Sequence, residues 1–383
     1  MGEAEAKRMT EVKIIAGPKS WIEGEAVRQL ENTAQLPGVV AAWGLPGLHP
    51  SQGCPVDAVF LTHGRIYPHL VGSDIGCGMA LWRTSIKPRQ PERIAKKLTR
   101  GARLEHGVDD PLSYLEQAGV KPCGFESSLG TVGRGNHFAE ILTFAEIRDE
   151  WRASTMLGGS NSFLLVHSGS RGYGEKILHE HTATHQGRGI SAEGETEVWN
   201  AYWQSHNHAM DWASVNRDVI ASRIFEKLGA TGEKITESVH NYVEPLLSNV
   251  EQVQFIHRKG AIPANTTPIV IPGSRGSHTY VVEAIDGCSE SGWSVSHGAG
   301  RKMSRKDARV KFTIENPSMK SLERTKFGSV VICEDRVLLM EEAPEAYKPI
   351  DRVIQDLVDH GLVKVIALLK PVVTYKYSRG AEE

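Results

Sequence analysis

The chain has 383 residues, of which 40% are hydrophobic and 23% are charged, as is usual for a globular protein with a sizeable core. Its formal net charge of −2 excludes a polycation, so any contact with nucleic acid has to come from a local basic patch. No apolar run reaches the ~18 residues that a membrane span needs, and the N-terminal segment lacks the apolar core of a signal peptide.

The five cysteines carry information about the compartment. No two of them have a C-x-x-C spacing, and an odd number cannot all pair within one chain. We therefore expect a reducing, cytoplasmic setting without disulfides. Cys123, Cys288 and Cys333 have no set of polar companion residues in the sequence, so we interpret them as core residues or as cysteines without a specific role.

The spacing of apolar residues predicts helices and strands that alternate without a regular βαβ rhythm. In chain order, the predicted elements are a helix over 22–32, strands over 58–61 and 79–86, a helix over 91–98, a strand over 163–166, a long helix over 195–228, strands over 253–256, 268–271 and 280–285, a helix over 349–360, and one or two strands over 362–377. No Pro-, Gly- or Ser-rich linker divides the chain. These features predict an α+β fold, with residues 1–383 as a single compact domain of mixed β-sheets and surrounding helices.

The loop between the first two predicted strands of residues 58–86 contains Asp74 and Cys77, three residues apart and flanked by glycines. A thiolate is a soft ligand and a carboxylate a hard one, so together they suit a borderline divalent metal such as manganese or zinc. The alternative interpretation is a buried cysteine in a glycine-rich turn, with Asp74 capping the backbone.

Histidines recur in further segments that are rich in Gly, Ser or Asn. His137 follows a glycine-rich run over 129–135 that either binds phosphate through its N–H groups or forms a turn before a helix. His167 and His240 follow, each beside a polar residue. With Asp74 and Cys77 they provide five donors. One ion with water uses too few of these, so we favour two ions that share Cys77.

Two later segments suggest phosphate chemistry instead. Residues 272–277 follow a predicted strand and could form a nest for an anion. His297 directly precedes a Gly-x-Gly sequence and a basic helix start. The remaining histidines have weaker signals. We interpret His181 and His185 as a solvated helix face, and four others as structural or surface residues: His63, His69, His206 and His208.

Seven motifs, in order, resemble the RtcB-type RNA ligase family: DIGCGM, GRGNHFAE, HSGSRGYG, HNY, RKGA, PGSRGS and HGAGRKMSR. The resemblance runs from about Asp57 to Lys376. It implies a single α+β domain that joins RNA ends with a 3′-phosphate or 2′,3′-cyclic phosphate to a 5′-hydroxyl, in RNA repair or tRNA splicing. It also implies GTP and two Mn²⁺ ions as cofactors, a histidine–GMP intermediate, and broken or spliced RNA as partner, with an activating protein as a further possible partner.

Residue by residue, the resemblance implies one Mn²⁺ on Asp74, Cys77 and His137, and another on Cys77, His167 and His240. His297 is implied as the nucleophile that takes GMP. The implied guanylate pocket consists of Asn136, His137, Glu140, His240, Asn241, Pro272, Gly273, Ser274, Arg275, Thr279, His297, Gly298, Ala299, Gly300 and Lys376. Basic side chains position a nucleic-acid backbone, so three arginines are candidates for contacts with RNA phosphates, the alternative being ordinary surface arginines: Arg171, Arg301 and Arg305.

The sequence departs from the family pattern at four positions. Arg134 stands where glycine is common, Arg275 replaces Met, Thr279 replaces Ser, and Val239 stands where a histidine is frequent. These departures indicate a divergent branch with a retuned substrate. Two other functions stay open: a two-metal phosphodiesterase or phosphatase, and a module that binds RNA ends in a repair complex without ligation. The sequence gives no indication of the oligomeric state.

Overall fold

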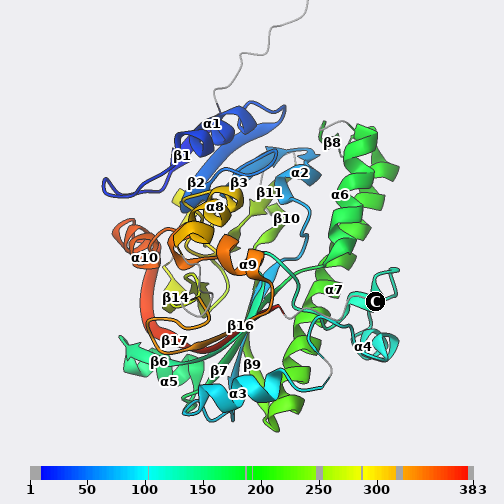
Figure 1. Ribbon diagram of the computed structural model, residues 1–383. Coiled ribbons are helices and arrows are strands. Elements are labelled where there is room, and N and C mark those ends of the chain that lie inside the picture. The colour runs from blue at the N-terminus through cyan, green and yellow to red at the C-terminus, as the bar shows by residue number, and fades with distance from the viewer. Residues whose placement is uncertain are drawn as a thin grey trace, which may run out of the picture.

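Two large β-sheets with helices around them make up the computed structural model, which is an α+β structure (Figure 1). It describes residues 10–101, 103–185, 188–191, 193–246, 253–285, 288–315 and 322–377, except for the side chain of His185. Among these residues, no helix is both long enough and apolar enough to cross a membrane.

The first sheet has five strands in the order β1-β2-β3-β11-β10. Their bounds are β1 Glu11–Ile14, β2 Val39–His49, β3 Val56–His63, β11 Gln254–Lys259 and β10 Asn241–Leu246. The β1–β2 pair is parallel and the other three pairs are antiparallel. Helix α1 (Gly24–Thr33) covers one face, because Ala26 and Leu30 pack against Ala42 and Phe60 in one buried cluster.

The second sheet follows the order β13-β14-β17-β6-β7-β5-β9, and β16 pairs with β17 as its eighth strand. Their bounds are β13 Ile269–Pro272, β14 Thr279–Ala284, β17 Val363–Tyr377, β6 Phe138–Ile147, β7 Phe163–Ser168, β5 Gly78–Thr84, β9 Gly232–Val239 and β16 Val330–Cys333. Two short antiparallel pairs complete the described strands: β12 (Ala261–Pro263) with β15 (Ser294–Ser296), and β4 (Arg65–Ile66) with β8 (Ile190–Ser191).

The chain passes directly from one large sheet to the other at His240. This residue lies between the last residue of β9, in the eight-stranded sheet, and the first residue of β10, in the five-stranded sheet. Its backbone N–H donates to the carbonyl of Cys77 at 2.9 Å, and its own carbonyl accepts from Ala261 at 3.1 Å. His240 therefore marks a seam at which the two sheets meet.

The helices lie on the outside of the sheets. The described helices beyond α1 are α2 Pro68–Val71, α3 Pro91–Leu98, α4 Pro111–Gln117, α5 Glu150–Leu157, α6 Gly172–His185, α7 Thr196–Leu228, α8 Arg305–Glu315, α9 Arg336–Glu341 and α10 Ile350–Asp359. The 33-residue α7 runs down one side of the molecule (green in Figure 1) and packs Ile220 and Ile224 against the second sheet. It ends where Gly229 adopts a left-handed conformation, with φ +63°, that favours glycine.

Most of the predicted elements are confirmed. The helix predicted over 91–98 is α3, that over 195–228 is α7, and the segment 362–377 forms one strand, β17. The alternative of a helix after the glycine-rich run at 129–135 is wrong. The chain continues there as β6, because its residues pair with β7 on one side and β17 on the other. The prediction of a single domain over residues 1–383 stays a prediction.

The histidines that were assigned structural or surface roles mostly have internal partners. His206 is buried and accepts a hydrogen bond from the Val243 N–H at 3.1 Å, and His208 bonds the Tyr173 hydroxyl at 2.8 Å. His181 is half-buried between exposed residues of α6, and its ring also packs edge-on against the ring of Tyr202, 4.9 Å between centroids. The side chain of His185 lies outside the described residues.

All five cysteines fall within the described residues and have free thiols. The expectation of a chain without disulfides is therefore confirmed. Cys288 and Cys333 are buried in separate hydrophobic clusters, and Cys123 is half-buried against two others, as expected for core residues.

Candidate metal centre and its cavity

The five predicted metal donors come from neighbouring strand ends. Asp74 and Cys77 immediately precede β5, His137 precedes β6, His167 stands near the end of β7, and His240 follows β9. Strands β6, β7, β5 and β9 are consecutive neighbours in the second sheet, so these ends meet at one edge. The fold thus brings together side chains that are up to 166 residues apart in sequence.

The donor atoms form a compact cluster, which is buried except for Asp74, whose side chain is 27% exposed. The Cys77 Sγ atom lies 3.3 Å from the Nε2 atoms of both His137 and His167. The His167 Nε2 lies 3.3 Å from the His240 Nε2, and Asp74 Oδ2 lies 2.8 Å from the His137 Nε2. Among the described residues, the donor atoms of Cys77, His137 and His167 all lie within 4.8 Å of one another. All five predicted donors therefore belong to one connected group.

The chemistry of this group fits a divalent metal ion. Burial, helped by neighbouring positive groups, lowers the pKa of His167 and His240 well below the usual value, which keeps their imidazoles neutral. Burial and the nearby Asp74 raise the pKa of the Cys77 thiol. A bound cation offsets the cost of ionising this buried thiol, because a thiol that coordinates a metal ion is deprotonated. Thiolate, imidazole and carboxylate together suit a borderline metal such as manganese or zinc.

His297 lies beside this cluster, in the turn that follows β15. Its ring centroid is 4.7 Å from that of His240, and only 12% of its side chain is exposed. The Nδ1–H of His297 donates to Asp57 Oδ1 at 3.4 Å, since a carboxylate oxygen can only accept. This contact leaves the lone pair of Nε2 free, so the ring can act as a nucleophile.

Asp57 is a residue of the candidate site that the sequence analysis missed. It is completely buried in β3, and its carboxylate also accepts from the Gly47 N–H at 2.7 Å and from the Ser296 hydroxyl at 2.5 Å. Its backbone has φ +66°, a conformation in which Asp and Asn are enriched among non-glycine residues. The only sequence signal is an acidic residue inside an apolar strand, which does not reveal a partner 240 residues away.

Gly47 makes room for this carboxylate. A Cβ atom at position 47 would lie 2.5 Å from Asp57 Oδ2 and 3.1 Å from the carbonyl oxygen of Gly298. Real Cβ atoms do not approach neighbours so closely, so any side chain there would displace Asp57 or the turn that carries His297.

Four of the five predicted donors and His297 line one cavity of about 660 Å³, within the range typical of small-molecule sites. Among the residues predicted for a guanylate pocket, those that line it are Asn136, Glu140, His240, Asn241, Pro272, Gly273, Ser274, Arg275, His297, Gly298, Ala299, Gly300 and Lys376. His137 contacts Cys77 but is not among the residues that line the cavity. Thr279 does not line the cavity, because it is buried in β14 between β13 and β17.

A buried acid and a buried base face this cavity. Burial raises the pKa of Glu140 to about 7, and its carboxylate accepts from the Thr374 hydroxyl at 2.5 Å. Burial lowers the pKa of Lys376, whose Nζ lies 3.7 Å from a carboxylate oxygen of Glu342. Buried polar groups in a cavity, such as the carboxyl of Glu140 and the amine of Lys376, can select a ligand by its hydrogen-bond donors and acceptors.

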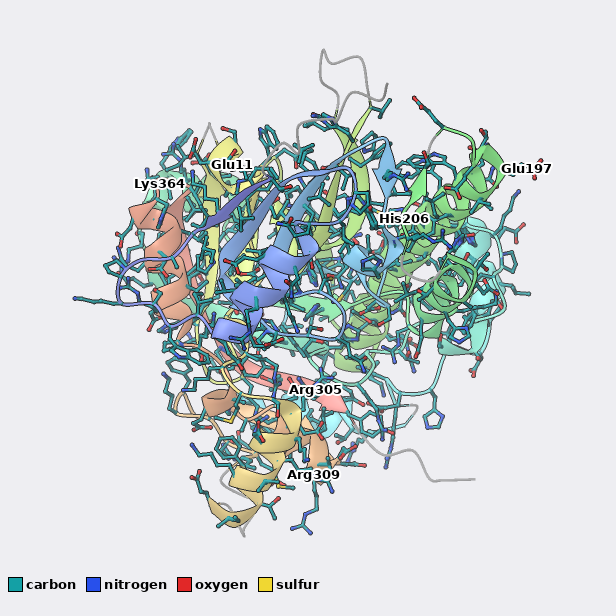
Figure 2. All side chains as sticks on the ribbon, turned by 90° about the horizontal axis from the view of Figure 1, so that it is seen from above. Glu11, Glu197, His206, Arg305, Arg309 and Lys364 are labelled. Atoms are coloured by element: carbon teal, nitrogen blue, oxygen red, sulfur yellow. The ribbon has the colours of Figure 1, made fainter. Side chains whose placement is uncertain are left out.

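The arginines predicted to contact phosphates differ in their surroundings. Arg301 donates to the Glu341 carbonyl at 2.8 Å and pairs with Glu342 at 3.1 Å, so internal contacts occupy it. Arg171 is turned inward and its Nη1 lies 3.2 Å from the Nδ1 of His137. Arg305 lies at the start of α8 and lines the cavity; its Nε is 3.4 Å from a carboxylate oxygen of Glu342, but 52% of its side chain is exposed, so part of the guanidinium stays accessible. In Figure 2 it lies nearer the centre of the molecule than Arg309, farther along the same helix.

The two arginines that depart from the family pattern have structural contacts. Arg275 is buried and donates to the carbonyls of Leu339 and Glu342 at 2.8 and 2.7 Å, which satisfies the C-terminal end of α9. Arg134 is exposed, pairs with Asp335 at 3.3 Å, and its guanidinium lies 4.7 Å from the ring centroid of Tyr377. Neither guanidinium is free of protein partners.

Comparison with known proteins assigns the family. The sequence model of the family described as "tRNA-splicing ligase RtcB" matches residues 29–113 and 121–377. The chain belongs to the RtcB family. Every residue of the metal-donor cluster, together with Asp57 and His297, falls within the matched RtcB ranges.

Relatives in the RtcB family match along nearly the whole chain. The chain is 39% identical over 372 residues to the RNA-splicing ligase RtcB2 of an Escherichia coli strain, a match that covers 96% of both proteins. It is 29% identical to the RNA-splicing ligase RtcB of Escherichia coli K12, with coverage of 93% and 95%. It is 26% identical to the tRNA-splicing ligase RtcB of Archaeoglobus fulgidus, with coverage of 92% and 91%.

Proposed function

We propose that the protein is an RNA ligase that joins 3′-phosphate or 2′,3′-cyclic phosphate ends to 5′-hydroxyl ends, using GTP and two Mn²⁺ ions. One observation carries the proposal: a buried carboxylate holds His297 beside a Cys–His cluster, in a cavity that also contains Glu140 and Lys376. The family membership and the names of its relatives as RNA-splicing ligases support the same function.

In the proposed first step, the Nε2 of His297 attacks the α-phosphorus of GTP. An N–P bond forms, the bond from phosphorus to the bridging oxygen breaks, and pyrophosphate leaves. The ring becomes a cation when its lone pair is used, and the carboxylate of Asp57 stabilises this charge through the Nδ1–H. Asp57 therefore acts as a positioning residue for the nucleophile.

In the later steps the guanylate passes from His297 to an oxygen of the RNA 3′-phosphate, and the 5′-hydroxyl then displaces GMP. Asp74, Cys77, His137, His167 and His240 would hold the metal ions. Bound there, divalent ions would withdraw charge from the phosphates and supply hydroxide to open a cyclic phosphate. Glu140 and Lys376 would bind the guanine base, since a buried carboxylate and ammonium present an acceptor and a donor.

A ligation assay tests the proposal. Two RNA fragments, one with a 3′-phosphate and one with a 5′-hydroxyl, should be joined by the wild type only when GTP and Mn²⁺ are both present. The His297→Ala variant should not join them, although its fold and metal content should match the wild type. Joining by this variant, or joining that does not depend on GTP, would contradict the proposal.

A two-metal phosphodiesterase or phosphatase is the second candidate, because the five-donor cluster is complete without His297. Such an enzyme would cleave phosphodiesters without GTP, and His297→Ala would retain that activity. A module that binds RNA ends without ligation would show binding and no turnover.

We also propose that residues 1–383 act as one catalytic unit and that the protein works in a reducing, cytoplasmic compartment. The free thiols support the reducing compartment.

A further inference from the structure

Trp21 is an exposed aromatic residue that lines the same cavity as His297. The indole belongs to the segment between β1 and α1, and 53% of the residue is exposed. Glu23, His49 and Pro50 line the same cavity. A large apolar side chain exposed to solvent in a functional cavity is informative, because such surfaces commonly bind a ligand.

The backbone next to Trp21 is held in place. The hydroxyl of Ser20 bonds to the carboxylate of Asp356, which is 1% exposed, and it accepts from Arg352 Nε at 2.9 Å. The Ser20 N–H donates to the Gly17 carbonyl at 2.9 Å and closes a turn. Helix α10, which carries Asp356 and Arg352, thereby fixes the segment and reduces the entropy that Trp21 loses on binding a ligand.

The same cavity also has cations in its lining. Two exposed cations line the cavity: Lys302, just before the start of α8, and Arg305, at its start. They come from a part of the chain about 280 residues after Trp21, so the fold brings an aromatic side chain and positive charge into the lining of one cavity. Proteins bind single-stranded nucleic acid with this combination, in which bases stack on aromatic rings and cations contact the phosphates.

We propose that Trp21 stacks on an unpaired nucleobase of the RNA strand whose end reaches His297, and so positions that end. The inference rests on the proposed ligase function and identifies a determinant of its substrate. A base inside a duplex is already stacked on its neighbours and cannot cover the indole. The protein should therefore favour RNA ends that have an unpaired nucleotide near the reacting phosphate.

Equilibrium binding of a fluorescently labelled single-stranded RNA with a 3′-phosphate tests the proposal directly. Trp21→Ala should weaken binding by about 5- to 150-fold, the loss that corresponds to one stacked base. Trp21→Phe should restore most of it. Trp151→Ala is the matched control, because Trp151 is 71% exposed on α5 and does not line the cavity. It should bind RNA as the wild type does.

A series of RNAs with one abasic nucleotide at each of the last positions then identifies the stacked base. At one position, removing the base should weaken binding by the wild type as much as Trp21→Ala weakens binding of the intact RNA. The Trp21→Ala variant should bind that abasic RNA as tightly as it binds the intact RNA. The proposal is wrong if Trp21→Ala binds RNA as tightly as Trp151→Ala. It is also wrong if, at every position, the loss of affinity from the substitution and the loss from the missing base add in full.

Guanylylation without RNA separates this proposal from the function on which it rests. Trp21→Ala should form the GMP adduct at the wild-type rate. A slower adduct with unchanged RNA binding would mean that Trp21 stacks on the guanine of GTP, which overturns the inference. If the wild type forms no adduct, the proposed ligase function fails, whereas the abasic series still decides whether Trp21 stacks on RNA.

Discussion

Replacing Asp57 by asparagine should disable His297 with little change in shape. Asn adopts the positive-φ conformation of this residue as readily as Asp, so the substitution adds no backbone strain. The carboxylate accepts on both sides, from Gly47 and Ser296 on Oδ2 and from His297 on Oδ1. An amide has one oxygen and one NH₂ group, so it can accept on only one of these sides.

Either orientation of the new amide has a cost. With the NH₂ towards Gly47, a buried backbone N–H loses its closer acceptor and keeps only the Ser296 hydroxyl at 3.4 Å, which should lower the free energy of unfolding by about 1 kcal/mol or more. With the NH₂ towards His297, the ring would accept at Nδ1 and carry its proton on Nε2, where the lone pair is needed. A comparable change of tautomer in a serine-protease triad costs about 10⁴-fold in rate, so we expect the rate of guanylylation to fall by about 10²- to 10⁴-fold.

The assay is the single-turnover rate at which labelled GMP becomes attached to the protein, measured beside a denaturant unfolding curve. Metal content serves as the control, because Asp57 is not one of the five predicted donors and the variant should bind metal as the wild type does. Guanylylation by Asp57→Asn within a few-fold of the wild-type rate would refute the positioning role of this carboxylate.

Three further predictions follow from the same geometry. Gly47→Ala should push Asp57 away and slow guanylylation, because its Cβ would meet Oδ2 at 2.5 Å, whereas Gly159→Ala has no atom within 4 Å and should behave as the wild type. Cys77→Ala should lose at least one metal ion in elemental analysis, and unchanged stoichiometry would exclude a shared thiolate. Burial raises the pKa of Glu140 to about 7 from its usual 4.5, so ionisation destabilises the fold increasingly as the pH rises between these values. Gln cannot ionise, so the free energy of unfolding of Glu140→Gln, measured in denaturant titrations, should rise relative to that of the wild type as the pH increases. The difference should grow by about 3 kcal/mol between pH 4.5 and 7 and stay constant above pH 7.

The sequence was sufficient to predict which five side chains the fold brings together in the candidate metal centre, because each lies in a short polar segment next to an apolar strand. His167 follows the run that forms β7, and Cys77 precedes the run that forms β5. The helix α7 was likewise predicted closely, since a long 3.6-residue periodicity is a strong signal. What could not be predicted is the strand order, which depends on pairings between residues far apart in sequence, such as β17 with β6.

The two residues missed by the sequence analysis show why a site is harder to predict than its motifs. Asp57 has no motif around it, and its role comes from a contact with His297 between different sheets. Trp21 is a single aromatic residue in a polar segment, and only the fold brings it to the cavity. Arg275 is the converse case: it stands in a segment predicted to bind an anion, yet its guanidinium donates to carbonyl groups at the end of a helix. Side-chain direction decides these cases, and local sequence does not encode it.

The central claim is that His297 becomes covalently guanylylated. Incubation with α-labelled GTP and Mn²⁺, followed by proteolysis and mass spectrometry of the labelled peptide, tests it most directly. A phosphoramidate on histidine is stable in alkali and lost in acid, which distinguishes it from an ester of serine. We expect one GMP per chain, on His297, with that stability. Label on another residue, or no label from a metal-loaded protein that cleaves phosphodiesters, would contradict the account.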